Sequence, residues 1–113
     1  MKLHPLMLAF ACAFGATASA APVLLLCVTE NPVTVRGRTY QIVFDESAHT
    51  VTRDDRKPVK ARITDTLVSW TEAFAYGATE KWTIDRLSGA WRIDIQMGTG
   101  VNGKCTAPPA RQF

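Results

Sequence analysis

The sequence predicts a small all-β domain: a single antiparallel meander of seven or eight short strands, barrel-like or a sandwich, tied by one disulfide. Three observations predict this fold class. Apolar and polar residues alternate with a period of two along several segments, which is typical of half-buried strands. Turn residues recur about every ten residues, and no segment after the first twenty residues shows a clear helical pattern. An open sheet of this size would leave one apolar face in water, so we expect the sheet to close on itself.

Residues 1–20 are predicted to be a secretory signal peptide. Lys2 supplies a positive start, residues 6–15 form an apolar core, and Ala18-Ser19-Ala20 is a small-residue cleavage site, so we expect cleavage after Ala20. The apolar run is too short to span a bilayer. A lipoprotein modified at Cys12 is an alternative, although Phe10 interrupts the small-residue triplet that it needs. We therefore expect a periplasmic or secreted protein without a transmembrane segment.

The remaining chain, residues 21–113, is expected to be one β domain that ends in a non-regular tail at residues 107–113. Removal of Lys2 leaves twelve basic and ten acidic residues, a net charge of +2 with histidine neutral. Removal of Cys12 leaves Cys27 and Cys105, and an even pair in an exported chain predicts a disulfide. By the chain-entropy model, this crosslink would contribute roughly 4 kcal/mol.

The first strand is expected at Val23–Thr29, an apolar run that Glu30-Asn31-Pro32 ends. Such a run is typical of a strand buried on both faces or of the last part of a signal region, and Cys27 favours the strand. A second strand is expected at Arg38–Asp45, where apolar residues alternate with polar ones. A turn then leads to a third strand at Thr50–Thr52.

The segment Arg53–Arg62 is the most polar part of the chain, and five of its ten residues are basic. One interpretation is a patch for an anionic ligand or nucleic acid. The other is a solvated loop ended by Pro58, which leads into a strand with Lys60 and Arg62 facing outward. We favour the loop, because the mature charge is nearly balanced, aspartates are interleaved and the chain carries an export signal.

The segment Leu67–Tyr76 is expected to be a strand that turns at Gly77-Ala78. A helix is the alternative, since some of its aromatic residues also fall at three- and four-residue steps. Glu72 is unusual because it shares a face with aromatic residues. If that face is buried, Glu72 should have a raised pKa or an Arg or Lys partner. The residues expected on this face with Glu72 are Val68, Trp70, Phe74 and Tyr76.

The segment Lys81–Ile95 predicts the central hairpin of the domain. Its two arms alternate cleanly, and its turn, Arg86–Gly89, contains a glycine that can adopt a positive φ. Asp85 precedes the turn and could accept backbone N–H groups there. After the hairpin, Asn102-Gly103 is a favoured tight-turn dipeptide, and Cys105 follows on a last short strand or loop. The apolar residues expected to share the inner surface of the hairpin are Trp82, Ile84, Trp91, Ile93 and Ile95.

The sequence predicts no catalytic, cofactor or metal site. A Ser-His-Asp triad needs a histidine, and His49, the single histidine after residue 20, lies with its nearest serine and aspartate in one turn, which is typical of an exposed loop. The carboxylates and cysteines do not show a metal-ligand spacing. Paired acids for glycoside hydrolysis could be drawn from Glu72, Asp85 and Asp94. Three tryptophans are enough to fill a barrel this small, which disfavours a ligand inside it.

The hairpin motif Ile84–Gly89 (IDRLSG), the hairpin at 40–51 and the C-terminal CTAPPARQF together resemble small exported proteins of Gram-negative bacteria. That group carries an IDR-[T/S]-G-like hairpin and a cysteine-proline-arginine-phenylalanine tail, and the resemblance implies no activity. The chain also resembles the periplasmic inhibitors of c-type lysozyme in size, export signal, β-barrel build and a cysteine pair that joins the chain ends. Their inhibitory loop has a Ser-Gly-x-x-Tyr-like motif, and the nearest segments here, residues 88–91 and 76–78, do not match it.

We therefore expect a non-catalytic periplasmic or secreted binding module, associated with the envelope. The alternative is an inhibitor of a cell-wall hydrolase, and a small hydrolase that uses Glu72 or Asp85 ranks below both. We expect the partner to be an envelope protein or a cell-wall hydrolase and not nucleic acid. The residues expected to contact a partner lie in two loops and are Arg53, Arg56, Lys57, Arg86 and Ser88.

Overall fold

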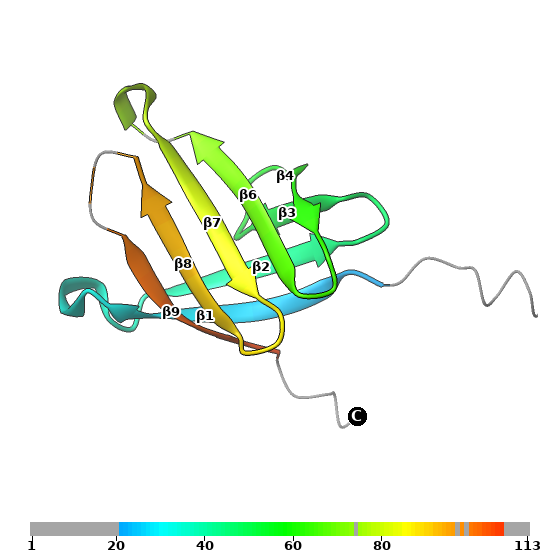
Figure 1. Ribbon diagram of the computed structural model, residues 1–113, viewed down its shortest axis with the longest axis horizontal. Coiled ribbons are helices and arrows are strands. Elements are labelled where there is room, and N and C mark those ends of the chain that lie inside the picture. The colour runs from blue at the N-terminus through cyan, green and yellow to red at the C-terminus, as the bar shows by residue number, and fades with distance from the viewer. Residues whose placement is uncertain (1–20, 74, 97, 99, 108–113) are drawn as a thin grey trace, which may run out of the picture.

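Nine antiparallel strands form one nearly closed, barrel-like sheet in the computed structural model, which describes residues 21–73, 75–96, 98 and 100–107 (Figure 1). The strand order is β4-β3-β2-β1-β9-β8-β7-β6-β5. The all-β prediction is confirmed. The strands are β1 (Val23–Asn31), β2 (Thr39–Asp45), β3 (Thr50–Arg53), β4 (Val59–Lys60), β5 (Arg62–Ile63), β6 (Leu67–Ala73), β7 (Thr79–Asp85), β8 (Ala90–Ile95) and β9 (Val101–Thr106). Two 3₁₀ turns, η1 (Val33–Val35) and η2 (Ala75–Gly77), interrupt the meander.

Two meanders, β1–β4 and β5–β9, are joined because the first strand pairs with the last. The two edge strands, β4 and β5, are separated in the chain by Ala61 alone, whose N–H donates to the carbonyl of His49 at 2.9 Å. The single strand expected after Pro58, with Lys60 and Arg62 facing outward, is thus divided into β4 and β5, which raises the number of strands from the expected seven or eight to nine. The predicted signal peptide and residues 108–113 of the predicted tail lie outside the described residues.

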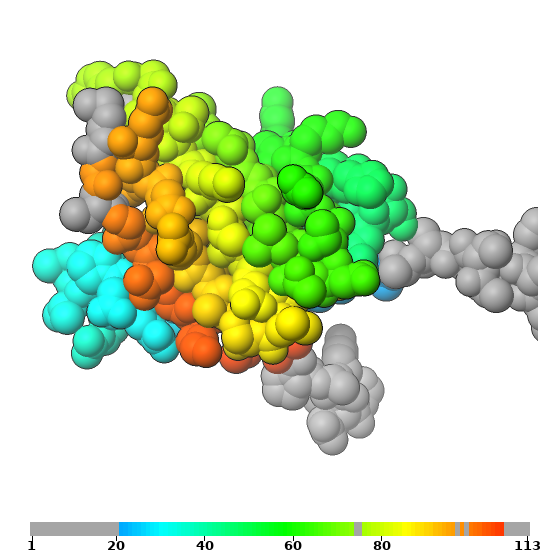
Figure 2. Space-filling view, in the orientation of Figure 1, coloured from blue at the N-terminus to red at the C-terminus, as the bar shows by residue number. Residues whose placement is uncertain are grey.

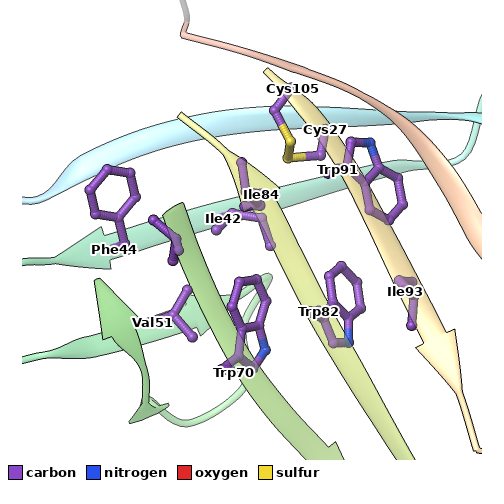
Figure 3. Packing of buried hydrophobic residues seen from close by; sticks show 11 residues of the cluster. Cys27, Ile42, Phe44, Val51, Trp70, Trp82, Ile84, Trp91, Ile93 and Cys105 are labelled. Carbon is purple, nitrogen blue, oxygen red and sulfur yellow. A yellow bond between two sulfur atoms is a disulfide. The ribbon is translucent and has the colours of Figure 1, made fainter. Parts of the chain in front are cut away.

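A stack of three indole rings fills the centre of the barrel (Figure 3). The ring centroids of Trp70 and Trp82 lie 5.3 Å apart, and those of Trp82 and Trp91 lie 5.6 Å apart. Tyr40 meets both Trp82 and Trp91 edge-on. Ile42, on β2 with Tyr40, is completely buried in the same core. Burial of these large side chains is the main source of stability in so small a domain.

The inward faces predicted for β2, β7 and β8 are confirmed, whereas β1 is not buried on both faces. Its outward residues Leu24, Leu26 and Val28 keep 36–40% of their surface exposed. The strand also continues through Glu30 to Asn31, so the polar residues do not end it. A barrel wall has solvent on one side, so an apolar run in it alternates in burial like any other strand.

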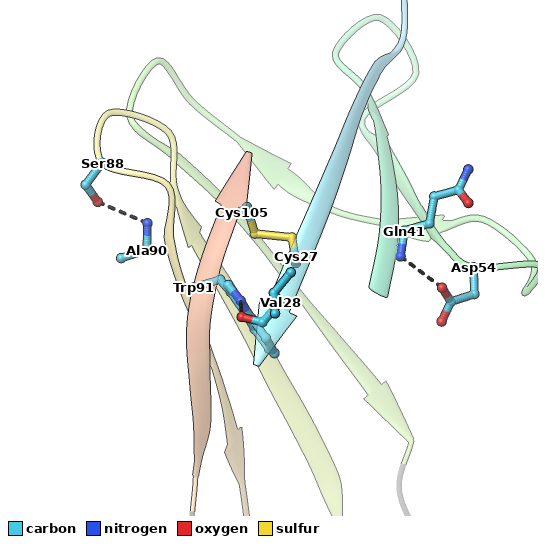
Figure 4. The surroundings of a disulfide bond; sticks show 8 residues. All are labelled: Cys27, Val28, Gln41, Asp54, Ser88, Ala90, Trp91 and Cys105. Carbon is cyan, nitrogen blue, oxygen red and sulfur yellow. Dashed lines mark hydrogen bonds between the residues drawn. A yellow bond between two sulfur atoms is a disulfide. The ribbon is translucent and has the colours of Figure 1, made fainter. Parts of the chain in front are cut away.

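The Asn102-Gly103 dipeptide does not form a tight turn but lies within β9. Gly103 is opposite Trp91 on β8, and the Trp91 Nε1–H donates to the carbonyl of Val28 on β1 at 3.2 Å (Figure 4). A β-carbon at position 103 would overlap the carbonyl oxygen of Val28 and lie 2.8 Å from Trp91 Nε1. Gly103 therefore allows close packing between strands. Glycine is favoured at such close approaches as well as in tight turns.

The predicted disulfide joins Cys27 and Cys105, which face each other across the β1–β9 ladder (Figure 4). It crosslinks residues 78 positions apart in the chain. The pairing of β1 with β9 closes the largest loop of the fold, so the crosslink acts where loop closure costs the most entropy.

Candidate functional site

Glu72 is the most completely engaged carboxylate of the described residues. Its side chain, on β6, is 10% exposed. Arg53 donates from Nε to Oε2 at 3.0 Å and from Nη2 to Oε1 at 2.6 Å, which is a bidentate pair. Arg56 Nη1 donates to Oε1 at 2.9 Å, and Trp70 Nε1 donates to Oε2 at 2.7 Å. Two arginines therefore partner Glu72, as expected for a buried carboxylate on an aromatic face.

The pKa of Glu72 is lowered, not raised. Burial is the largest influence and raises this pKa, but the hydrogen bonds from Arg53 and Trp70 and the charges of Arg53 and Arg56 together outweigh it. A general acid at neutral pH needs a raised pKa and access to substrate. This geometry suits Glu72 to tying β3 and β6 together and not to acid catalysis.

Arg53, expected as a contact residue of a loop, lies at the end of β3 and is held by internal contacts. Its side chain is 14% exposed, and its guanidinium carbon lies 4.9 Å from the ring centroid of Trp82 and 5.7 Å from that of Tyr40. Arg56 and Lys57 remain at the surface, and the side chain of Arg56 is 55% exposed. These two residues border a hollow of ≈ 300 Å³ next to Glu72.

The β7–β8 turn is organised by Asp85. Its carboxylate accepts the N–H groups of Leu87 at 2.8 Å and Ser88 at 3.2 Å, and these bonds lower its pKa. The Ser88 hydroxyl accepts the N–H of Ala90 at 3.1 Å (Figure 4). Gly89 adopts a φ of 81°, as its place in the turn predicts. Asp85 and Ser88 are thus both used to form the turn.

Arg86 is also held by internal contacts. Its guanidinium donates to the carbonyl of Thr64, contacts the carboxylate of Glu46 at 3.3 Å and lies 5.0 Å from the ring centroid of Phe44. Beside it is an open hollow of ≈ 390 Å³ with a mainly apolar lining that includes Leu25 and Leu87. The expected contact residues of this turn therefore shape a surface next to this hollow.

His49 lies exposed in the β2–β3 turn with a φ of 56°. Neither of its ring nitrogens has a hydrogen bond to a carboxylate or hydroxyl in the described part of the chain, so the structure does not assemble a triad around it there. Among residues 21–73, 75–96, 98 and 100–107, no three of the histidines, cysteines and acidic residues converge on a point that could hold a metal ion.

Tyr76 is the residue whose position sequence reasoning missed. It was expected on the inner face with Trp70, but it lies in η2, between β6 and β7, and is fully exposed at 102%. Its φ is 59°, in the left-handed region, and Gly77 follows with a φ of 79°. Strand alternation ends at Ala73, so the period-two pattern no longer applies at position 76, and Phe74 lies outside the described residues. The sequence did contain one signal for this position: the Tyr-Gly dipeptide, just before a new strand, indicates that the chain turns at Tyr76.

The fold places the expected contact residues and Tyr76 in three separate groups. Arg53, Arg56 and Lys57 gather with Glu72 around the hollow between β3 and β6, and Arg86 and Ser88 lie at the β7–β8 turn. The fold does not bring these two groups into one site. Tyr76 stands on a third turn, at the opposite end of β7 from Arg86 (Figure 1).

No family model, curated protein or solved structure matches this chain. The part of the chain that the structure describes contains no helix that is both long and apolar enough to cross a membrane.

Proposed function

We propose that the chain is a non-catalytic binding module, exported to the periplasm or secreted and associated with the envelope, that contacts a protein partner through the turn at Tyr76. The observation that carries this proposal is the complete exposure of Tyr76 at the tip of a turn with left-handed backbone. A large amphipathic side chain held away from the core gains most when a partner buries it, and tyrosine is enriched at interface hot spots for this reason.

The filled interior of the barrel favours binding at the outer surface over binding inside. The stacked rings of Trp70, Trp82 and Trp91 occupy the space in which a small barrel would hold a ligand. The carboxylates best placed for chemistry, Glu72 and Asp85, are engaged by arginines or by backbone N–H groups. Recognition at exposed turns is therefore better supported than chemistry inside the barrel.

The backbone at Tyr76 supports the same assignment. A residue other than glycine with φ near +60° is strained, and such residues persist at functional turns. The N–H of Gln96 donates to the carbonyl of Thr79 at 3.0 Å, which fixes the base of the turn against the end of β8. Figure 2 shows this turn, in olive green, at the margin of the molecule. A rigid base and a protruding aromatic tip suit insertion into a cleft.

The test is affinity capture from periplasmic and envelope extract by the oxidised chain 21–113. Three proteins are immobilised: the wild type, Tyr76→Ala, and Leu87→Ala as a matched control, since Leu87 is 79% exposed on the β7–β8 turn. We expect one stoichiometric partner on the wild type and on Leu87→Ala, with at least tenfold less on Tyr76→Ala, as for a hot-spot aromatic residue (roughly 2 kcal/mol). Equal retention by all three proteins would contradict the role of Tyr76.

An inhibitor of a cell-wall hydrolase is the second candidate. The observation that favours it is again the convex tip at Tyr76, because the catalytic cleft of a hydrolase is concave and a protruding ring can block it. A panel of lysozymes and other cell-wall hydrolases is assayed with micromolar oxidised protein. Inhibition that Tyr76→Ala abolishes and Leu87→Ala preserves is expected for an inhibitor. Full hydrolase activity throughout the panel would remove this candidate and leave the binding module.

A further inference from the structure

The outer wall of β4–β7 contains a shallow depression of ≈ 420 Å³ with a basic rim. Strand alternation builds it. On β5 and β6, Arg62 is paired with Ser69, and on β6 and β7, Thr71 is paired with Lys81, so all four side chains lie on the outer face of the sheet. Lys60 precedes Arg62 by two residues and also faces outward. This wall faces the viewer in Figure 2, where the green atoms of β5 and β6 meet the yellow atoms of β7.

The three cations of this basic depression, Lys60, Arg62 and Lys81, make no ion pair with any described residue; the ion pairs of the described chain use Arg53, Arg56, Arg86 and Arg92. The lining contains no carboxylate. By register, the nearest acidic residue to Lys81 is Asp94 on β8, and its carboxylate is bound by Arg92 Nε at 3.1 Å. The positive charge of the basic depression is therefore not neutralised by the described protein.

The positive surface continues beyond the basic depression. Thr71 also lines the neighbouring hollow of ≈ 300 Å³, where Arg56 and Lys57 lie. The acid in that hollow, Glu72, is already paired with Arg53 and Arg56. Arg62 and Lys81 flank β6 on opposite sides, two strand spacings apart across the sheet and two residues apart along it, which places their backbones about 12 Å from each other. Cations spaced in this way along a continuous surface can contact successive anionic groups of one polymer, but a single small anion would meet only part of them.

We infer that this wall binds an anionic polysaccharide. Lys60, Arg62 and Lys81 would contact successive sulfate, phosphate or carboxylate groups, and the hydroxyls of Ser69 and Thr71 between them would hydrogen-bond sugar hydroxyls. This inference does not rest on the proposed role of Tyr76. It also revises the interpretation of Arg53–Arg62 as a solvated loop, because the fold adds Lys81 and two hydroxyls from distant strands to the cations of that segment.

The surroundings of the basic depression favour a polysaccharide over a lipid surface or a nucleic acid. Binding in a membrane interface buries apolar side chains, but the large exposed apolar residues of the described chain lie elsewhere, on β1, in η1 and η2 and at the β7–β8 turn. Single-stranded nucleic acid stacks its bases on exposed aromatic rings. The aromatic residue in the lining, Trp70, is 4% exposed and its ring lies in the core.

The test is titration calorimetry of the oxidised chain 21–113 with a heparin hexasaccharide as the probe, in 50 mM and 300 mM NaCl. Lys60→Gln/Arg62→Gln/Lys81→Gln removes the three cations. Arg36→Gln/Arg38→Gln/Lys104→Gln, on the β1–β2 turn and β9, removes the same charge from exposed positions elsewhere. We expect binding by the wild type that weakens with salt, a roughly tenfold loss for the first variant and less than a twofold loss for the second. Thermal unfolding midpoints within error of the wild type confirm that both variants fold.

Two further titrations distinguish a polysaccharide from a lipid surface and from a nucleic acid. Vesicles of phosphatidylglycerol and phosphatidylcholine and a dT15 oligonucleotide are titrated under the same conditions. Tighter binding to the vesicles or to dT15 than to heparin would overturn the assignment to a polysaccharide. Absence of heparin binding by the wild type at 50 mM NaCl would also overturn it, and equal losses in both triple variants would show an effect of net charge without a site.

Discussion

The Arg53–Glu72 pair connects the two halves of a barrel-like sheet whose edge strands, β4 and β5, have only two residues each. The strands β3 and β6 are not neighbours in the sheet, yet Arg53 and Glu72 connect them directly. The guanidinium of Arg53 also lies over Trp82, so one side chain joins a charge pair, a cation–π contact and the tryptophan stack. Loss of either member would leave a poorly hydrated charge without its partner, which costs more than the pair contributes.

Replacement Glu72→Gln should lower the free energy of unfolding at pH 7 by about 2 kcal/mol, because Arg53 loses a charged, bidentate acceptor. Urea denaturation followed by tryptophan fluorescence measures this change. Asp94→Asn is the matched control, since it breaks the exposed Arg92–Asp94 pair, whose side chains are 66% and 48% exposed. We expect the control to change stability by less than about 0.5 kcal/mol. Equal effects of the two substitutions would contradict a structural role for Glu72.

The same residue predicts a pH dependence. The folded state lowers the pKa of Glu72, so the unfolded chain takes up this proton at a higher pH than the folded chain does. The ionised carboxylate therefore stabilises the fold above the ordinary glutamate pKa of about 4.3. This stabilisation is lost as the pH falls from there through the folded-state pKa. Urea midpoints between pH 7 and pH 3 should fall less steeply for Glu72→Gln than for the wild type, and parallel curves would contradict the prediction.

At the scale of the element, β9 depends on the absence of a side chain at Gly103. The strand passes between β1 and β8, and the indole of Trp91 reaches across it to the carbonyl of Val28. Gly103 and Trp91 are directly opposite in the register, so the ring lies over the glycine. A strand glycine normally weakens pairing, but here it permits a partly buried hydrogen bond and close contact between the backbone and an aromatic ring.

Replacement Gly103→Ala should destabilise the domain by about 2–3 kcal/mol, because the new methyl group must displace the backbone of Val28 or the ring of Trp91. Gly98→Ala is the control, since among the described residues a β-carbon there meets Ile95 at ordinary distances, Cγ2 at 3.8 Å and Cβ at 4.0 Å. Urea midpoints and near-ultraviolet circular dichroism report stability and the packing of Trp91, respectively. An unchanged midpoint for Gly103→Ala would show that β9 can shift without cost.

At the scale of the whole molecule, the fold depends on joining its two ends. The β1–β9 ladder unites the two meanders, and the Cys27–Cys105 crosslink lies within that ladder. The loop that it closes contains most of the domain, so the crosslink removes much of the freedom of the unfolded chain. Domains of this size have total stabilities of about 5–15 kcal/mol, and a single crosslink is then a substantial part of the total.

The double replacement Cys27→Ala/Cys105→Ala should reduce the free energy of unfolding by roughly 4.5 kcal/mol, the chain-entropy value for a separation of 78 residues. Urea denaturation of the oxidised wild type, the reduced and alkylated wild type and the double variant measures the loss. The two forms without the disulfide should agree closely in their midpoints. A loss below 1 kcal/mol would indicate that the β1–β9 ladder alone holds the ends together.

Local pattern predicted much of this structure because a strand places successive side chains on opposite faces, whatever its neighbours are. The inward positions of Trp82 and Trp91 and the turn held by Asp85 followed from that rule and from turn chemistry. An even pair of cysteines in a chain expected to be exported likewise predicted the disulfide. These inferences needed only the spacing of residues along the chain or their number.

Tertiary structure alone decided which distant residues meet. The pairing of Arg53 with Glu72 and the gathering of Lys81 with Lys60 and Arg62 depend on barrel closure and strand register. Both are set by contacts between segments far apart in the chain, which local periodicity does not encode. The outward position of Tyr76 belongs to the same class, because alternation predicts a face only while the strand continues. The core of this protein could thus be read from its sequence, and its candidate binding surfaces required the fold.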